Sequence, residues 1–276
     1  MSDTPTSAVW MSLMIGNTRL HWGLFDGHTL IAVRHTPHLV RVNDIQTLID
    51  NGFSYADGQR PQSLWVASVV PEQTALCLQA TIDCHVVQCS QVPLADVYPT
   101  LGIDRAINLL GAKDRIGWPV LVIDAGTALT FTAGAQRNGE AAIYGGTILP
   151  GIRLQGAALR TGTASLEEAI AHSQIAFQQS DLPPRWARDT SGAIASGLIY
   201  GTVATLVDTL TDWWQLFPKG SAVLTGGDGA QLHHFVQQKT PEVASRVYLE
   251  SELAFYGMLA YRRSLVTESD HLNEAS

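Results

Sequence analysis

A carboxylate, a glycine and a hydroxyl lie close together in the sequence at Asp124, Gly126 and Thr127. The preceding residues 120–123 are apolar and mostly β-branched, which predicts a buried strand, and alternation resumes over residues 129–132. A tight turn between two such strands would bring backbone N–H groups, a hydroxyl and a charge to one phosphate. An ordinary Asp-x-Gly hairpin turn has the same residues, so this turn alone leaves both interpretations open.

A second polar glycine turn lies near the N-terminus. Residues 13–15 lead into Gly16, Asn17 and Thr18, and alternation follows over residues 19–25. A strand, a glycine turn and a return strand, repeated about one domain length apart, indicate two related halves that face one ligand. Two phosphate-holding hairpins in a duplicated α/β chain are typical of the actin-like ATPase and sugar-kinase superfamily. We therefore expect a duplicated actin-like (ribonuclease H-like) fold, although fold analogy alone does not fix the substrate.

The composition suits this interpretation. A chain of 276 residues can bury a sizeable core, as one large domain or as two halves. A hydrophobic content of 46% with 15% charged residues is ordinary for a soluble enzyme. The formal net charge of −8 argues against non-specific binding of nucleic acid, which needs a basic face.

The three cysteines, Cys77, Cys84 and Cys89, fall in one stretch without CxxC spacing. An odd count without a signal peptide indicates reduced thiols and a cytoplasmic protein. A metal site that also uses His85 is the alternative. The most apolar segment, residues 193–207, is interrupted by polar side chains, so we expect no membrane partner.

The stretches that must position these turns alternate between strands and helices, which favours halves with a mixed sheet flanked by helices. In the first half, residues 9–116, we expect strands at 13–15, 19–25, 31–34, 64–70 and 86–89 and helices at 42–51, from 71 onwards and at 104–116. Asn43 or Asp44 is the expected cap of the helix over 42–51.

The second half, residues 117–265, continues the pattern, and residues 266–276 are expected to be a flexible acidic tail. We expect strands at 120–123, 129–132, 221–224 and 247–249 and helices at 152–159, from 191 or 192 to 214, from 230 onwards and at 253–262. Ser165 and Glu168 form a capping box that predicts one more short helix. In the long helix Gly197 and Gly201 share a face, which fits a dimer seam and tight core packing equally well.

Two more glycine-rich segments belong to the second half. Residues 144–151 contain Gly145, Gly146 and Pro150, which imply a close approach of backbone to backbone or to a ligand. Residues 225–229, Thr-Gly-Gly-Asp-Gly, precede a helix and would hold a phosphate or admit a flat base.

Asp104 and Arg105 stand together at the start of a predicted helix. The ordinary explanation is structural, because a carboxylate in the first turn complements the helix dipole and the arginine is then a solvated partner.

Taken together, the motifs resemble those of the type III pantothenate kinases, which are related to the Bvg accessory factors. The resemblance covers nearly the whole chain. Its motifs are Gly16-Asn17-Thr18 with Gly23-Leu24-Phe25, Gly102-Ile103-Asp104-Arg105, Asp124-Ala125-Gly126-Thr127-Ala128, Gly145-Gly146 through Pro150-Gly151, Thr190 ahead of Ala193-Ile194 and Ser196-Gly197, and Thr225-Gly226-Gly227-Asp228. Each motif is common, whereas the ordered set is highly specific.

The resemblance implies that ATP phosphorylates the primary hydroxyl of pantothenate, the first committed step towards coenzyme A. Such a transfer mainly needs positioning and charge neutralisation, with a carboxylate to accept the hydroxyl proton. Asp104 would be this catalytic base. Arg105 and Gly102, with Ile103 in the same motif, would hold the pantothenate carboxylate and amide. Tyr98 matches the family's substrate-contacting tyrosine.

For the nucleotide, the resemblance implies that the turn from Met14 to His21 cradles the phosphates and that Thr127 contacts ATP. Asp124 would bind a monovalent cation, K⁺ or NH₄⁺. Thr190 matches a substrate-binding threonine that reaches the site across a dimer interface, so a homodimer with a shared active site is expected. The residues of the first turn are Met14, Ile15, Gly16, Asn17, Thr18, Arg19, Leu20 and His21.

One departure concerns Met14, because the family's first motif usually begins Asp-x-Gly-Asn. A thioether is a poor ligand for Mg²⁺, which prefers oxygen. Mg²⁺ often keeps several waters and binds the phosphates of the nucleotide, so we still expect an active enzyme. The alternatives are a weakly active or inactive accessory protein that binds pantothenate or nucleotide, and a kinase of the same superfamily with another acceptor.

Overall fold

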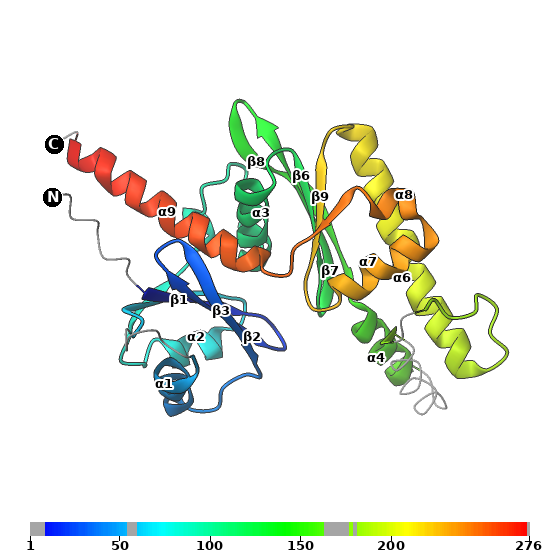
Figure 1. The fold of residues 1–276 in the computed structure, drawn as a ribbon, viewed down its shortest axis with the longest axis horizontal. Coiled ribbons are helices and arrows are strands. Elements are labelled where there is room, and N and C mark those ends of the chain that lie inside the picture. The colour runs from blue at the N-terminus through cyan, green and yellow to red at the C-terminus, as the bar shows by residue number, and fades with distance from the viewer. Residues whose placement is uncertain (1–8, 54–59, 163–176, 179–180, 275–276) are drawn as a thin grey trace. The chain divides into compact units, whose positions relative to one another are not determined.

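The computed structural model describes residues 9–53, 60–162, 177–178 and 181–274 (Figure 1). The chain divides into two compact units. The first comprises Met1–Asp114 and Ala254–Ser276, and the second comprises Arg115–Leu253. The predicted halves ended at residue 116 and at residue 265, whereas the final helix clusters with the first unit.

The first unit contains a five-stranded mixed sheet. Its strands are β1 (Val9–Ile15), β2 (Leu20–Asp26), β3 (Thr29–Thr36), β4 (Ser63–Ser68) and β5 (Asp83–Val86). Their order in the sheet is β3-β2-β1-β4-β5, in which β1 pairs antiparallel with β2 and parallel with β4. The first glycine turn therefore connects the two strands of the β1–β2 hairpin.

Helices cover the first sheet because its central strand is apolar on both sides. These helices are α1 (Val42–Asn51), α2 (Pro71–Cys77), α3 (Ile103–Arg115) and α9 (Leu253–Glu274), with a short 3₁₀ helix η2 (Cys89–Gln91). Met11 and Leu13 of β1 share a buried cluster with Ile45 of α1. On the other side Trp10 stacks on Phe25, and α9 contributes to that cluster.

The second unit repeats this sheet. Its strands are β6 (Val120–Ala125), β7 (Ala128–Arg137), β8 (Glu140–Pro150), β9 (Ser221–Thr225) and β10 (Val247–Leu249). The order β8-β7-β6-β9-β10 matches that of the first sheet strand for strand, and β6 pairs antiparallel with β7 and parallel with β9. Each half therefore has a mixed sheet flanked by helices, as predicted.

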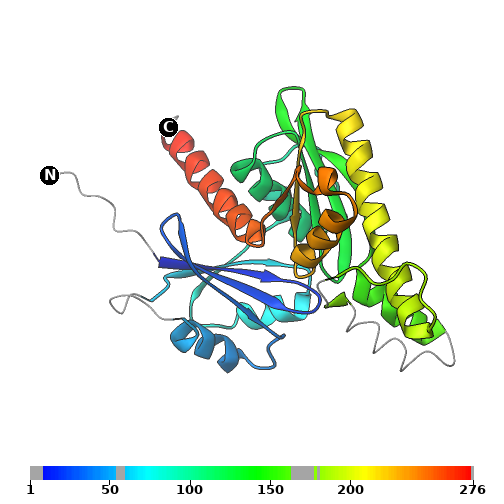
Figure 2. The ribbon, with the colours of Figure 1, turned by 45° about the vertical axis from the view of Figure 1, so that its right-hand side comes forward.

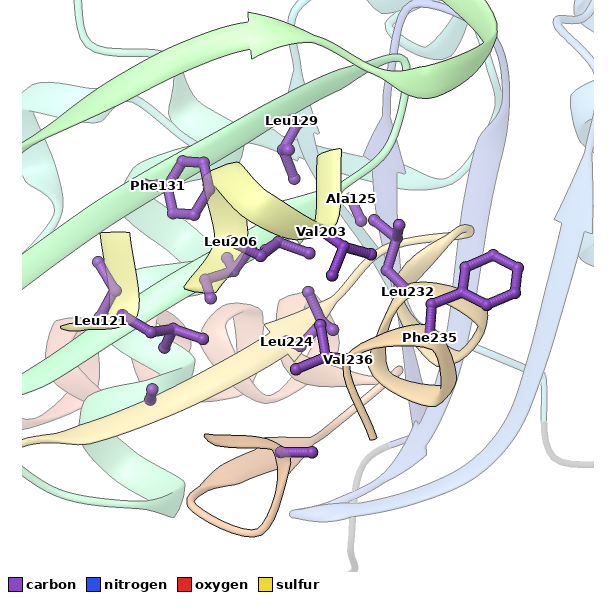
Figure 3. Packing of buried hydrophobic residues seen from close by; sticks show 14 of the residues in the cluster. Leu121, Ala125, Leu129, Phe131, Val203, Leu206, Leu224, Leu232, Phe235 and Val236 are labelled. Carbon is purple, nitrogen blue, oxygen red and sulfur yellow. The ribbon is translucent and has the colours of Figure 1, made fainter. Parts of the chain in front are cut away.

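The helices of the second unit are α4 (Ile152–Gly162), α6 (Thr190–Leu216), α7 (Gly229–Lys239) and the short α8 (Pro241–Ala244). Leu121 and Phe131 of the sheet pack with Val203 and Leu206 of α6 and with Phe235 of α7 (Figure 3). Figure 2 shows α6 in yellow, lying along the second sheet beside α7. This cluster is the core of the second unit.

Among the described helices, α6 is the one long and apolar enough to cross a membrane by length and composition, with a mean hydropathy of 1.4. Its buried residues Ile199, Val203 and Leu206 pack in the core of the second unit. The core helix of a soluble protein passes the same test, and 44% of the apolar window in α6 is buried. A Cβ atom built at Gly197 or Gly201 meets nothing within 4 Å, so tight core packing at these glycines is not found among the described residues.

Several elements differ from the predictions. No strand was predicted for the residues of β8, whose glycines and Pro150 were expected to allow a close approach of backbone. They pair with β7 as an edge strand, where both residue types are tolerated. The strand expected at 86–89 lies at 83–86 and is followed by η2.

Helix ends also differ. Neither Asn43 nor Asp44 caps α1. Its N-cap is Arg41, and the Asp44 carboxylate accepts a hydrogen bond from the Arg41 backbone N–H at 3.0 Å. Helix α9 extends to Glu274, so most of the expected tail is helical. The short helix predicted after Ser165 lies outside the described residues.

Candidate active site

The residues of the Gly-x-Asp-Arg motif meet at the start of α3 in the first unit. The Arg105 side chain is 7% exposed and donates from Nη1 to the hydroxyl of Tyr98 at 2.9 Å. The Arg105 backbone N–H donates to Oδ1 of Asp104 at 2.9 Å. The structure therefore brings Tyr98, Asp104 and Arg105 together, and their contact with substrate stays a prediction.

Gly102 leaves room for the Asp104 carboxylate. A Cβ atom at Gly102 would lie 2.4 Å from Asp104 Oδ1, so a larger residue would displace the proposed base. Ile103 is buried, and only its backbone is suited to a polar ligand. Burial and then the charge of Asp104 raise the pKa of the nearby Cys89 thiol, which therefore stays protonated near neutral pH.

The first glycine turn connects β1 to β2 over residues 16–19. The Gly16 N–H donates to the carbonyl of Arg19 at 3.0 Å, which closes the turn, and Asn17, Thr18 and Arg19 are exposed. Ile15 and Leu20, at 2% and 1% exposure, belong to the core cluster of the first unit. Their side chains are apolar and buried, so these two residues offer only backbone groups to a phosphate.

His21 belongs to the end of this turn. Its Nδ1 lies 2.8 Å from Nδ1 of His35 on the neighbouring strand, within hydrogen-bonding distance. Burial, with help from His35 and Arg19, lowers the pKa of His21 to about 4. His21 is therefore neutral at physiological pH and adds no positive charge for a phosphate.

The second turn is shorter, because β6 ends at Ala125 and β7 begins at Ala128. Gly126 N–H donates to the Ala128 carbonyl at 3.0 Å, and the Gly151 N–H donates to the Thr127 carbonyl at 2.9 Å. A Cβ atom at Gly151 would lie 2.1 Å from the Gly126 carbonyl oxygen. The turn is thus held by direct backbone packing, and Thr127 at its tip is exposed.

A third glycine turn, after β9, packs against the same place. Gly226 has a φ of +87°, and a Cβ atom there would lie 2.4 Å from Asp124 Oδ1 and 2.6 Å from the Ala125 carbonyl oxygen. Only glycine suits both the left-handed backbone and this close approach. Gly226 therefore packs closely against the partly exposed carboxylate of Asp124.

Sheet register shows what surrounds Asp124. Its neighbours across the strands are Thr130 and Thr225, both buried, and neighbours in register share one face of a sheet. A carboxylate with hydroxyls beside it suits a hard cation such as K⁺. In the first sheet the equivalent residue, Met14, has His21 and Ala67 as neighbours.

Met14 and these two neighbours offer no side-chain oxygen, so this set of residues does not suit Mg²⁺. Within the part of the chain that the structure describes, no group of three or more His, Cys, Asp or Glu side chains is placed to hold a metal ion. The clustered metal site considered for the cysteines is therefore not found among these residues, and all three cysteines are free thiols.

Thr190 begins α6 in the second unit. It is exposed, and the N-cap Asp189 accepts a hydrogen bond from the Gly192 N–H at 2.8 Å. The arrangement holds the first turn of α6 in place and leaves the Thr190 side chain at the surface. Its predicted contact with substrate stays a prediction, as does the prediction that the two hairpin turns face one nucleotide.

Sequence reasoning missed an ion pair and a histidine. Arg153 Nη2 lies 3.2 Å from Oδ1 of Asp228, a residue that is 8% exposed and whose pKa is raised by burial, although Arg153 opposes the shift. His38 contacts the first glycine turn, with Nε2 at 2.8 Å from the Gly16 carbonyl oxygen. Both contacts join residues far apart in sequence, and no local sequence pattern predicts them.

Comparison with solved structures defines the class of fold. A Baf-family protein from Campylobacter jejuni matches with a TM-score of 0.58 at 18% identity, covering 93% of this chain and 99% of that one. MreB5 of Spiroplasma citri, solved with ADP, and a 2-hydroxyisocaproyl-CoA dehydratase activator from Clostridium difficile, solved with ADPNP, each match with a TM-score of 0.53. The match with MreB5 has 10% identity and covers 96% of this chain and 99% of the MreB5 chain. The match with the dehydratase activator has 12% identity and covers 95% of this chain and 97% of the activator chain. The fold is the duplicated actin-like ATPase fold, as predicted.

Sequence comparison defines the family. The family model for type III pantothenate kinase matches residues 11–212. A type III pantothenate kinase from Nostoc sp. (strain PCC 7120) is 40% identical over 264 residues, covering 90% of this chain and 92% of the relative. One from Synechocystis sp. (strain PCC 6803) is 38% identical, covering 94% and 92%. The chain belongs to the type III pantothenate kinase family, which confirms the resemblance seen in its motifs.

Proposed function

We propose that the chain phosphorylates pantothenate with ATP at a site built on Asp104. Membership of the family supports this activity, the first step of coenzyme A biosynthesis. The observation that supports the site best is the cluster at the start of α3, where Tyr98 and Arg105 are joined by a hydrogen bond of 2.9 Å beside Asp104. A buried arginine with a fork of donors is suited to a carboxylate such as that of pantothenate.

In this proposal the oxygen of the pantothenate hydroxyl attacks the γ-phosphorus of ATP, and Asp104 accepts the proton of that hydroxyl. The bond from that phosphorus to the β–γ bridging oxygen breaks, and ADP leaves with that oxygen. The exposed residues Asn17, Thr18 and Arg19 and the backbone of the first turn bind the phosphates, and Thr127 contacts the nucleotide from the second turn.

Asp124 is proposed to hold a K⁺ or NH₄⁺ ion. The support is its carboxylate beside Thr130 and Thr225 and the close approach of Gly226 to that carboxylate. Such an ion would neutralise charge near the phosphates. Mg²⁺ would be held by the phosphates of ATP and by water, because the Met14 position offers no oxygen.

A homodimer that shares its active site through Thr190 is also proposed. The α6 helix exposes a stripe of small residues, and none of the described residues comes within 4 Å of a Cβ atom built at its two glycines. This stripe comprises Ala193, Gly197, Gly201 and Ala204. A second copy would cover it, and the solution mass measured by light scattering should be that of two chains. A monomeric but fully active enzyme would contradict this assembly.

The catalysed reaction is best tested by a coupled ADP assay with ATP and a panel of hydroxylated acceptors, in K⁺, NH₄⁺ and Na⁺. Pantothenate should be the preferred acceptor, and the rate in Na⁺ should be low. Preference for another acceptor would favour a different kinase of the superfamily. No turnover at high Mg²⁺ would favour an accessory protein.

We also propose a cytoplasmic location, which the three free thiols support.

A further inference from the structure

The first glycine turn is tied to a distant part of its own unit by one side chain. His38, in the loop between β3 and α1, lies with Nε2 2.8 Å from the carbonyl oxygen of Gly16. A carbonyl oxygen only accepts, so Nε2 must carry the proton in this contact. The imidazole therefore donates to the turn both when it is neutral and when it is charged.

The loop that carries His38 is itself fixed. Gln73 of α2 accepts from the Leu39 backbone N–H at 3.0 Å and donates from Nε2 to the Leu39 carbonyl at 2.9 Å. Both hydrogen-bonding groups of the residue after His38 are thus fastened to α2. This arrangement limits the freedom of the imidazole to move away from Gly16.

The consequence for the turn follows from the planar trans peptide bond. The carbonyl of Gly16 and the N–H of Asn17 belong to one peptide plane and point in opposite directions. A donor that holds the carbonyl therefore also sets the direction of the Asn17 N–H. That N–H belongs to the exposed part of the turn, where the proposed function places the phosphates of ATP.

We propose that His38 is a positioning residue that aims the Asn17 N–H at a phosphate of the nucleotide. The inference rests on the proposed function of the first turn and adds the residue that orients its binding group. The second turn needs no such residue, because its Gly126 and Thr127 carbonyls are packed directly against Gly151. At the first turn the Gly16 carbonyl is contacted by the imidazole of His38.

The test compares His38→Leu with His38→Gln in the purified full chain. Loss of the donor in His38→Leu should raise the KM for ATP about tenfold and weaken binding of a non-hydrolysable ATP analogue equally. The KM for pantothenate should stay within about twofold, because Asp104 and Arg105 are untouched. The amide of His38→Gln can donate to the same carbonyl, so this variant should stay within about threefold of the wild type.

His28→Leu is the matched control, since His28 is exposed in the turn between β2 and β3, at the other end of strand β2. This control should leave the KM for ATP, the KM for pantothenate and the affinity for the analogue unchanged.

Gln73→Ala, which frees Leu39 but keeps His38, provides a second test if His38→Leu folds poorly. It should raise the KM for ATP about threefold.

An unchanged KM for ATP in both His38→Leu and Gln73→Ala, in an enzyme that binds the analogue normally, would overturn the role of His38 and leave the proposed function standing. A wild-type chain that does not bind the analogue would instead overturn the proposed function, and this inference with it.

Discussion

The two glycine turns occupy the same place in two sheets of identical strand order, yet they are held differently. The second turn is short and is fixed by glycine backbone, with Gly151 and Gly226 packed against it. The first turn, over residues 16–19, is longer and is held by a side chain, that of His38. A duplicated element can therefore keep its topology while the contacts that stiffen it change from backbone packing to a replaceable hydrogen bond.

The chemistry of the two turns differs as well. In the second sheet Asp124 lies between two threonines, whereas in the first Met14 lies between His21 and Ala67. Oxygen ligands are thus found at the equivalent position in one half only. The difference supports a division of labour in which the second turn holds a cation and the first contacts phosphate through its backbone.

The strongest test of this comparison is a matched pair of glycine substitutions. Gly151→Ala places a Cβ atom 2.1 Å from the Gly126 carbonyl oxygen, whereas Gly16→Ala places one 3.5 Å from the Arg19 carbonyl oxygen. We expect Gly151→Ala to lower the free energy of unfolding by about 3 kcal/mol or more and Gly16→Ala by less than about 1 kcal/mol. Urea unfolding of both variants measures this, and equal losses would contradict the closer backbone packing at Gly151.

The next effect concerns the cation. Asp124→Asn removes the charge while keeping the shape, so turnover in K⁺ should fall by about tenfold to a hundredfold. The preference for K⁺ over Na⁺ should disappear as well. Glu140→Gln, which changes an exposed carboxylate on the same sheet, should leave both properties unchanged. A variant Asp124→Asn that still prefers K⁺ would place the ion elsewhere.

The smallest expected effect concerns pH and the first turn. His21 has a pKa of about 4 in the folded chain, below the ordinary 6.5. The unfolded chain therefore takes up this proton first, and the folded state loses stability as the pH falls from about 6.5 to 4. Because His21 is partly exposed, we expect a loss of about 1–2 kcal/mol.

His21→Asn should reduce that loss, measured by urea unfolding at several pH values between 4 and 7. The same substitution at the exposed His28 should not. A pH dependence identical in the wild type and His21→Asn would show that another group titrates in this window.

Much of the arrangement was predictable because it depends on local patterns. Apolar runs beside Gly16 and Gly126 predict two hairpins, and a helix starting near Asp104 follows from its spacing. The edge strand β8 was not predicted, because glycine and proline are typical of turns and only pairing with β7 makes this segment a strand. Local sequence indicates the conformation that a segment prefers, whereas an edge strand also depends on pairing with a neighbouring strand.

The candidate site divides in the same way. The motif around Asp104 and Arg105 was visible in the sequence, whereas the hydrogen bond from Arg105 to Tyr98 was not predicted. The contact of His38 with Gly16 joins residues 22 positions apart, and the pair of Arg153 with Asp228 joins residues 75 apart. Such contacts depend on how strands and loops pack, which no short pattern contains.

The central claim is that Asp104 takes the proton from the pantothenate hydroxyl. Its most direct measurement is the kcat of Asp104→Asn with saturating ATP and pantothenate, alongside binding of an ATP analogue. The account predicts that kcat falls by about a hundredfold to ten-thousandfold while affinity for the analogue changes little. A variant that keeps near-normal kcat would contradict it.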